Sequence, residues 1–289
     1  MNENFLRLPP NPIGPVKMVF LDLDGTTLNQ SKSLTPATLE ALRLLKKQGI
    51  PFTFASSRSA QMMALHCQQA CVTGPIIATE GADLLIWDTG NSIRRFPMDK
   101  TESLELIRYC HDSGFDYTIY TPQDAFFRQE TKRLPRFQQY NRRATEAGLL
   151  PVTCLFYEAY TPQYICSQGV LKVLVDGADP LIRDAVLQYV QARPALHAEM
   201  SESGLISVVS SQVSKATAIE LLCQMMGIQM EDVCCIGDYY NDIPMLSRAG
   251  WSVAMGNAPE EVRNTAQFVT FSNSDDGAAY FIRHYICGK

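Results

Sequence analysis

Two aspartates separated by one residue, Asp22 and Asp24, lie at the end of a short, mostly apolar run at residues 18–23. Such a run without Gly or Pro is typical of a buried parallel strand. Side chains alternate along a strand, so both carboxylates point to the same side. There they repel each other unless a cation or a shared proton relieves them. Gly25 then allows a sharp turn with N–H groups near an incoming anion, an arrangement that suits Mg²⁺ and a phosphate.

Acidic residues are also common in the polar loops after strands, so the chemistry depends on what accompanies this pair. Ser56 and Ser57 follow a second apolar run at residues 50–55 and open a helix, where hydroxyls and backbone amides form an anion site. Ser56 could instead only cap that helix. Further along the chain, Lys215 stands at the start of another predicted helix.

A second pair of acids, Asp238 and Asp242, follows a buried run at residues 233–236 and a glycine. The carboxyl ends of parallel strands meet at one edge of a sheet, so the four carboxylates are expected to converge. Together they are untenable without a hard divalent cation, and oxygen ligands favour Mg²⁺. One lysine and one hydroxyl at the same edge supply what a phosphoryl group needs.

The elements that position these residues alternate between strands and helices. Strands are expected at residues 18–23, 50–55, 75–78, 233–236 and 251–255, and the main helices between them at residues 36–48, from 59 onward, and at 216–226. This order predicts an α/β fold with a doubly wound, Rossmann-like parallel sheet and a site at the carboxyl ends of its strands.

Between residues 83 and 209 the pattern changes to short amphipathic strands (84–87, 116–120, 171–175) and helices (101–113, 180–192). The first pattern then resumes, which predicts an inserted α+β domain at residues 83–209 within a core of residues 1–82 and 210–289. Residues 131–150 of the insert carry a basic cluster of Lys132, Arg133, Arg136, Arg142 and Arg143. The cluster could face an anionic substrate, but a solvated helix face is the preferred interpretation.

Composition narrows the class of protein. The 289 residues are 46% hydrophobic and 19% charged, as in an ordinary soluble globular protein of about two domains. With a net charge of -5 and scattered Lys and Arg, the sequence does not indicate the basic surface that binds nucleic acid. Nine cysteines, placed mainly in apolar runs, indicate reduced thiols and a cytoplasmic location. We expect no membrane span and no signal peptide.

In these motifs and their order, the chain resembles the haloacid dehalogenase superfamily of phosphatases. The first motif, D-x-D-G-T-T/L, matches residues 22–27, and the second and third match Ser56 and Lys215. The fourth motif, G-D-x-x-N-D, matches residues 237–242 without a gap. The stretches at 255–262 and 272–277 resemble the Cof-type branch, in which an insert between the second and third motifs is a type IIB cap.

The resemblance implies a role for each acid. Asp22 would be the nucleophile that forms an aspartyl-phosphate, and Asp24 would protonate the leaving alcohol and then activate water. Mg²⁺ would be held by Asp22, the backbone carbonyl of Asp24, and Asp238. Asp242 would ligate through water or orient Lys215.

The resemblance also implies a set of groups that hold the phosphate. Ser56 and Lys215, with the backbone amides of Gly25 and Ser57, would neutralise the transferring oxygens. Asn241 would orient the phosphate or its neighbours. The substrate would be a small phosphorylated molecule enclosed by the cap, and the protein a monomer or homodimer.

The chain departs from the branch at two places. It has S-S-R at residues 56–58 where T-G-R is usual, and Glu80 before Gly81 where N-G-A is usual. The acid at Glu80 changes the charge near the hinge of the cap, so what the branch implies about the substrate is a weaker guide for this chain. For Asn257, a loop cap and a site role are both open.

Two other functions fit parts of the pattern. A phosphomutase of the same superfamily shares the nucleophile and metal but moves the phosphoryl group to a second hydroxyl. A non-catalytic phosphate sensor would keep the fold without turnover. No motif in the insert identifies the substrate.

Overall fold

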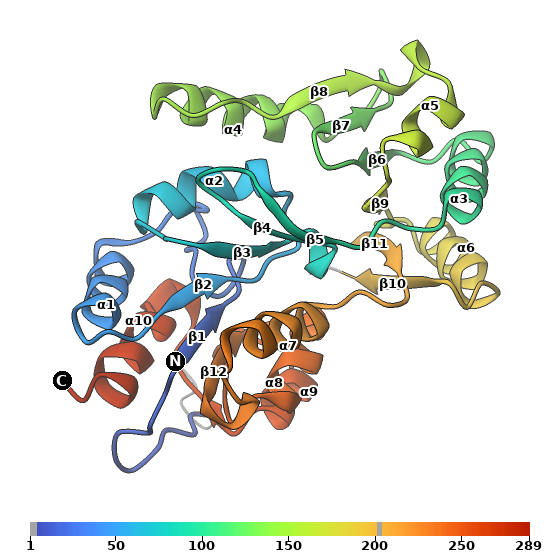
Figure 1. The fold of residues 1–289 in the computed structure, drawn as a ribbon. Coiled ribbons are helices and arrows are strands. Elements are labelled where there is room, and N and C mark those ends of the chain that lie inside the picture. The colour runs from blue at the N-terminus through green and yellow to red at the C-terminus, as the bar shows by residue number, and fades with distance from the viewer. Residues whose placement is uncertain (1–4, 201–203) are drawn as a thin grey trace.

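The computed structural model describes residues 5–200 and 204–289, and the chain forms two parts that each contain a sheet (Figure 1). The core sheet is parallel, with its five strands in the order β14-β13-β12-β1-β2. These strands are β1 (Met18–Leu21), β2 (Phe52–Phe54), β12 (Val233–Gly237), β13 (Trp251–Ala254) and β14 (Phe268–Val269). Leu21 lies opposite both Phe54 and Ile236. Strands β12, β1 and β2 therefore end level, and the residues after them share one edge.

Helices cover both faces of the core sheet because strand β1 is apolar on both sides. Val19 and Leu21 pack into the cluster that includes α1 and α10, whereas Met18 and Phe20 pack with α7, α8 and α9. These helices are α1 (Pro36–Lys47), α7 (Lys215–Met226), α8 (Ile243–Arg248), α9 (Glu260–Thr265) and α10 (Gly277–Phe281). The predicted doubly wound α/β core is confirmed. Within the two described ranges, no helix is long and apolar enough to cross a membrane.

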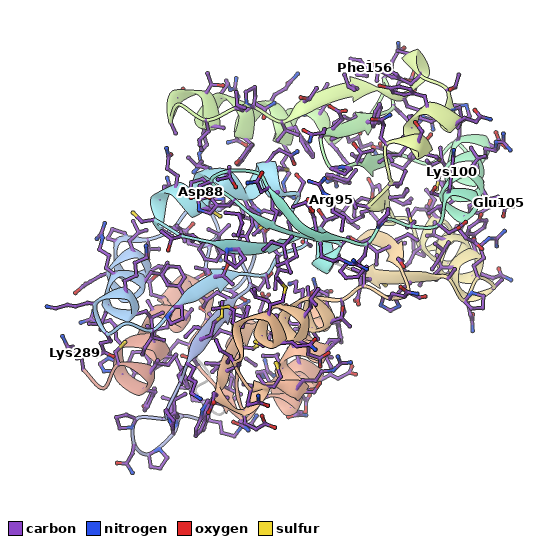
Figure 2. All side chains as sticks on the ribbon, viewed as in Figure 1. Asp88, Arg95, Lys100, Glu105, Phe156 and Lys289 are labelled. Atoms are coloured by element: carbon purple, nitrogen blue, oxygen red, sulfur yellow. The ribbon has the colours of Figure 1, made fainter. Side chains whose placement is uncertain are left out.

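A three-stranded sheet extends the core beyond β2. Strand β3 (Pro75–Ala78) meets the chain after β2 through one parallel bridge, Ala55 to Ile77. It pairs antiparallel with β4 (Asp83–Ile86), which pairs with β5 (Ser92–Arg95). Arg95, labelled in Figure 2, bonds the buried Asp83 at 3.0 Å. Because β4 and β5 pair with β3, we propose that the independent fold of the insert begins after residue 95, inside the predicted range 83–209.

The insert, called the cap below, is a six-stranded sheet in the order β10-β11-β9-β6-β7-β8. Its strands are β6 (Tyr117–Tyr120), β7 (Asp124–Phe127), β8 (Thr153–Phe156), β9 (Lys172–Asp176), β10 (Leu196–Met200) and β11 (Leu205–Ser210). Its helices are α3 (Lys100–Asp112), α4 (Leu134–Glu146), α5 (Pro162–Ser167) and α6 (Pro180–Gln191). Most neighbouring strands are antiparallel, so the predicted α+β character of the insert is confirmed.

The cap contacts the core through α2 (Ala60–Gln69), which lies beneath α4 in Figure 1. Leu65 of α2 packs in one apolar cluster with Phe137 and Tyr140 of α4. The Tyr140 hydroxyl donates to the Gln61 carbonyl at 2.5 Å and accepts from the Leu65 N–H at 3.2 Å. Helix α4 is thereby held next to the edge of the core sheet where the predicted site residues lie.

Candidate active site

The carboxylate of Asp22 lies directly after β1 and is almost fully buried. Its N–H donates to the Ile236 carbonyl at 3.0 Å, which continues the pairing with β12. Its own carbonyl accepts from the Thr27 hydroxyl at 2.5 Å, within the turn that follows. Backbone bonds on both sides therefore fix the position of this carboxylate.

The ammonium of Lys215 is the principal partner of Asp22. Lys215 begins α7 after Ser214, whose hydroxyl caps the helix, and its side chain is 1% exposed. Its Nζ lies 2.6 Å from Asp22 Oδ1 and 2.7 Å from Asp242 Oδ1. Burial lowers the pKa of Lys215, but the charges of Asp22 and Asp242 outweigh burial and raise it well above its ordinary value.

Asp242 and Asp238 organise the loop after β12. The second oxygen of Asp242 accepts from the N–H groups of Asp238 at 2.8 Å and Tyr239 at 3.1 Å. Asp238 accepts from the Thr26 hydroxyl at 2.7 Å. Gly25 has a φ of +84°, and a Cβ there would lie 2.2 Å from Asp238 Oδ2. A glycine is required at this turn for both its backbone conformation and its close approach to the acid.

The site is short of positive charge. One oxygen each from Asp22, Asp238 and Asp242 lies within 4.8 Å of the others, and all three residues are buried. Burial, and then Asp242, raise the pKa of Asp22 to about 7 despite Lys215. Burial, with Asp22 and Asp242, raises the pKa of Asp238 well above its ordinary value. Three buried carboxylates that share the single ammonium of Lys215 fit a hard, oxygen-preferring divalent cation such as Mg²⁺.

Asp24 lies apart from this triad, and its carboxylate is bonded to cations. Arg58 donates to both its oxygens, from Nε at 2.6 Å and Nη2 at 2.9 Å. Lys32 lies at 3.0 Å and Arg136 of the cap at 3.9 Å. Burial raises the pKa of Asp24, but these cations, Arg58 foremost, more than reverse it and hold that pKa well below its usual range. A metal ligand from Asp24 would therefore be its backbone carbonyl, as the family resemblance implies.

The two serines of the second motif differ in exposure to the site. Ser56 is fully buried and its hydroxyl accepts from the Arg58 N–H at 3.2 Å, whereas Ser57 lines a cavity. Ser59, not Ser56, stands at the N-cap of α2. Ser56 thus does not cap the helix, the alternative considered from the sequence.

The other predicted residues form links around the site. Asn241 lines the same cavity and donates to Glu80 Oε2 at 3.1 Å. Glu80 is buried, with a φ of +60°. Asn257 donates to the Gly25 carbonyl at 2.9 Å and lies 3.4 Å from Asp238 Oδ2. Of the two roles left open for Asn257, these bonds support a role at the site.

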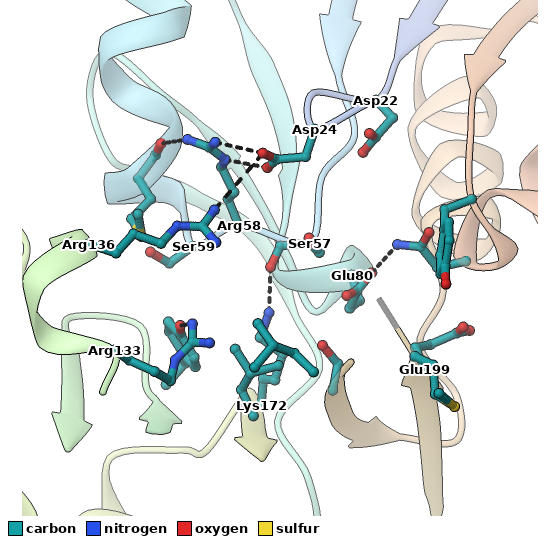
Figure 3. Close-up of a pocket in the computed structure, with 18 of the residues that line it drawn as sticks. Asp22, Asp24, Ser57, Arg58, Ser59, Glu80, Arg133, Arg136, Lys172 and Glu199 are labelled. Atoms are coloured by element: carbon teal, nitrogen blue, oxygen red, sulfur yellow. Dashed lines mark hydrogen bonds and ion pairs between the residues drawn. The ribbon is translucent and has the colours of Figure 1, made fainter. Parts of the chain in front are cut away.

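A cavity of about 230 Å³ lies between the core and the cap (Figure 3). From the core it is lined by Asp22, Asp24, Ser57, Glu80, Asp238 and Asn241, and from the cap by Tyr120, Arg133, Arg136, Lys172, Glu199 and Ser207, among others. The expected solvated face for the basic cluster holds for Lys132 and Arg142, which are exposed. It is wrong for Arg133, which is half-buried in the wall of the cavity because the start of α4 packs over the site edge, whereas Arg136 also lines the cavity but keeps 46% of its side chain exposed.

Several functional contacts had little signal in the sequence. Thr26 and Thr27 stand inside the first motif, so their proximity to the acids could have been inferred from it. Arg58 stands next to the second motif, but its pairing with Asp24 depends on how the two strand ends meet. Lys172 lies in an apolar strand of the insert, where only its charge among hydrophobic neighbours marks it.

Comparison with known proteins adds to this geometry. The model of the haloacid dehalogenase-like hydrolase family matches residues 19–282. A putative phosphatase of Haemophilus influenzae is 27% identical over 268 residues, which cover 92% of this chain and 97% of its own length. A pyridoxal phosphate phosphatase of Escherichia coli is 25% identical over 270 residues, covering 93% and 98%. The solved structure of a subclass IIB sugar phosphatase has a TM-score of 0.77 at 19% identity and covers 93% of this chain and 98% of its own, a likeness of fold.

We expect Lys215→Met to lower the free energy of unfolding by about 3–5 kcal/mol, because it leaves buried carboxylates without their cation. Urea unfolding at pH 8 in EDTA measures the change. The matched control is Lys17→Met, whose exposed pair with Asp232 at 2.6 Å contributes no more than about 1 kcal/mol. Equal losses in the two variants would contradict the importance of the buried pair.

Proposed function

The chain belongs to the haloacid dehalogenase-like hydrolases, whose family model spans residues 19–282, and from this premise we propose a Mg²⁺-dependent phosphatase that acts through an aspartyl-phosphate. The relatives named above support the hydrolysis of phosphate esters. The observation that carries the proposal is the buried carboxylate of Asp22, 2.6 Å from Lys215 and beside two further carboxylates. A cavity of about 230 Å³ supports a small phosphorylated metabolite as substrate.

Asp22 is placed to attack phosphorus. Lys215 occupies its Oδ1, which leaves Oδ2 to form the new P–O bond as the ester oxygen departs. The ammonium of Lys215 and the loop amides of Gly25 and Ser57 stabilise negative charge on the transferring oxygens. Held by Asp22, Asp238 and the Asp24 carbonyl, Mg²⁺ would shield the charge of the nucleophile from that of the phosphate.

Asp24 would move the protons of the reaction. It would give a proton to the departing alcohol and later take one from the water that hydrolyses the aspartyl-phosphate. In this conformation Asp24 is ionised and bonded to Arg58, so it is arranged to accept a proton rather than to donate one. The acid role therefore requires substrate binding to weaken the Arg58 pair.

The direct test is a screen of phosphorylated metabolites with the full chain, in Mg²⁺ and in EDTA, scored by free phosphate and by mass spectrometry of the organic product. We expect free phosphate with Mg²⁺ from at least one ester. We expect Asp22→Asn to abolish this release, because an amide is not a nucleophile toward phosphorus.

Each contrary result has a distinct meaning. Phosphate release by Asp22→Asn, with a fold checked by circular dichroism, would rule out Asp22 as the nucleophile. An isomeric phosphate ester in place of free phosphate would identify a phosphomutase. No product from any ester would leave a phosphate-binding protein without turnover.

Asp24→Ala should lower kcat on an alkyl phosphate by roughly 10²–10⁴-fold, the usual contribution of a positioned acid or base. With p-nitrophenyl phosphate, whose leaving group needs no proton, the first step should be spared and phosphorylated protein should accumulate. Intact-mass measurement after rapid quenching detects that species. An unchanged rate on the alkyl phosphate would contradict the role.

Mg²⁺ should raise the melting temperature more at pH 8 than at pH 6. Burial raises the pKa of Asp22 to about 7 and raises that of Asp238 well above its ordinary value. Stability therefore falls as pH rises from about 4 to about 7, because only the unfolded chain loses these protons in that range. A bound cation replaces the missing protons at pH 8 but competes with them at pH 6.

Differential scanning fluorimetry with and without Mg²⁺ at each pH measures this gain. Groups remote from the site contribute equally with and without Mg²⁺, so they do not affect this difference. Asp238→Asn should reduce the gain at pH 8. A gain of the same size at both pH values, or one retained in Asp238→Asn, would argue against a metal at this triad.

A further inference from the structure

Five cationic side chains line the cavity, and they divide into two groups. Lys32 and Arg58 are bonded to Asp24, at 3.0 and 2.6 Å. The other three, Arg133, Arg136 and Lys172, come from the cap and are called the cap cations below. Figure 3 shows all three on the cap side of the cavity, with Arg136 directed toward Asp24 and Lys172 toward Ser57. The proposed phosphatase chemistry gives none of the three a role.

Lys172 is a buried cation with neutral partners. Only 3% of the residue is exposed. Its Nζ donates to the Ser57 carbonyl at 2.5 Å and lies 4.9 Å from the centre of the Tyr120 ring. Among the described residues, no carboxylate lies within ion-pair distance of it. Burial lowers the pKa of Lys172 to about 8; the charge of Glu80 opposes this shift, and Arg133 and Arg136 act in the same direction as burial. A buried ammonium in this state is stabilised by an anion.

Arg133 and Arg136 have unused donors. Arg133 Nη2 donates to the Tyr120 hydroxyl at 3.3 Å, but its buried Nε has no hydrogen-bond partner within the described parts of the chain. Arg136 follows at i+3, on the same face of α4. Its Nη2 reaches only within 3.9 Å of Asp24, whose oxygens Arg58 and Lys32 already hold. Two planar guanidinium groups beside an ammonium suit a carboxylate or a phosphate.

The cap cations lie where the leaving group of a substrate would extend. The transferring phosphoryl group would have Lys215 and the acidic triad as its partners on the core side. Asp24, the proposed acid, would contact the leaving oxygen, and Arg136 approaches Asp24 from the cap side. The part of the substrate beyond that oxygen therefore faces Arg133, Arg136 and Lys172.

We propose that Arg133, Arg136 and Lys172 bind a second anionic group on the leaving group, so that the substrate is a phosphomonoester that also carries a carboxylate or a second phosphate. The inference rests on the proposed phosphatase function and narrows its substrate class. It also accounts for two features of the residues that the structure describes, a buried lysine with no carboxylate at ion-pair distance and an arginine Nε with no acceptor.

The test compares three matched esters on the full chain with Mg²⁺. Glycerol 3-phosphate has an uncharged leaving group, 3-phosphoglycerate adds a carboxylate, and glycerol 1,3-bisphosphate adds a phosphate. We expect kcat/KM for at least one acidic ester to exceed that for glycerol 3-phosphate by about 10-fold or more, the effect of one or two charge-assisted hydrogen bonds. A higher kcat/KM for 3-phosphoglycerate would identify a carboxylate as the second anionic group, and a higher kcat/KM for glycerol 1,3-bisphosphate would identify a phosphate.

Arg133→Gln and Arg136→Gln should each bring the ratio of kcat/KM for the acidic ester to kcat/KM for glycerol 3-phosphate toward one, mainly by raising KM for the acidic ester. The control is Arg142→Gln, because Arg142 is an exposed arginine of α4 outside the lining of the cavity; this variant should leave the ratio unchanged. Equal kcat/KM for all three esters would overturn the proposal, as would an equal loss of the ratio in Arg142→Gln.

A binding measurement separates this inference from the proposed function. If no ester is hydrolysed, the phosphatase proposal fails, and titration calorimetry on Asp22→Asn still compares 3-phosphoglycerate and glycerol 1,3-bisphosphate with glycerol 3-phosphate. Tighter binding of an acidic ester that is lost on adding Arg133→Gln supports the anion site. Equal binding of the three overturns it.

Discussion

The bond of one buried ammonium to two buried carboxylates is the constraint on which this molecule depends. Lys215 belongs to α7, Asp22 follows β1 and Asp242 follows β12, so a single side chain joins three segments that are distant in the sequence. Each of these charges would be strongly destabilising if it were buried without its partners. Asp242 extends the network to the backbone of Asp238 and Tyr239. The shape of the loop and the pairing of the charges thus depend on each other.

Much of the core could be predicted from the sequence because its strands are buried on both faces. Val19 packs on one side and Phe20 on the other, which gives short continuous apolar runs between helices with clear start and stop residues. The cap strands lack that signal. Strand β8 has only half-buried and exposed residues, and β5 is largely exposed. Their pairing depends on the neighbouring strands rather than on local pattern, so β5, β7, β8, β10 and β11 were not indicated.

The same division holds for the candidate site. The acids and Lys215 were found because each stands at the end of a core strand or the start of a core helix, and parallel register brings such positions together. The partners of Asp24 were not found, because the Arg58 pair joins residues 34 positions apart whose side chains meet only in three dimensions. The basic cluster was misassigned in part, at Arg133, for a related reason. Its sequence does not say which face of α4 meets the core, and that is set by the contact of Tyr140 with α2.

Glu80, where the related branch usually has an asparagine, gives the cavity unlike ends. Glu80 and Glu199 lie toward one side of the cavity, while Arg133 and Arg136 lie toward the other (Figure 3). The electrostatic field between these acidic and basic side chains would orient a ligand that carries two ester groups before the ligand contacts the walls of the cavity. Of two positional isomers, the cavity would present only one bond to the nucleophile. Regiochemistry would then be decided by where charges sit on the walls rather than by how closely the walls fit.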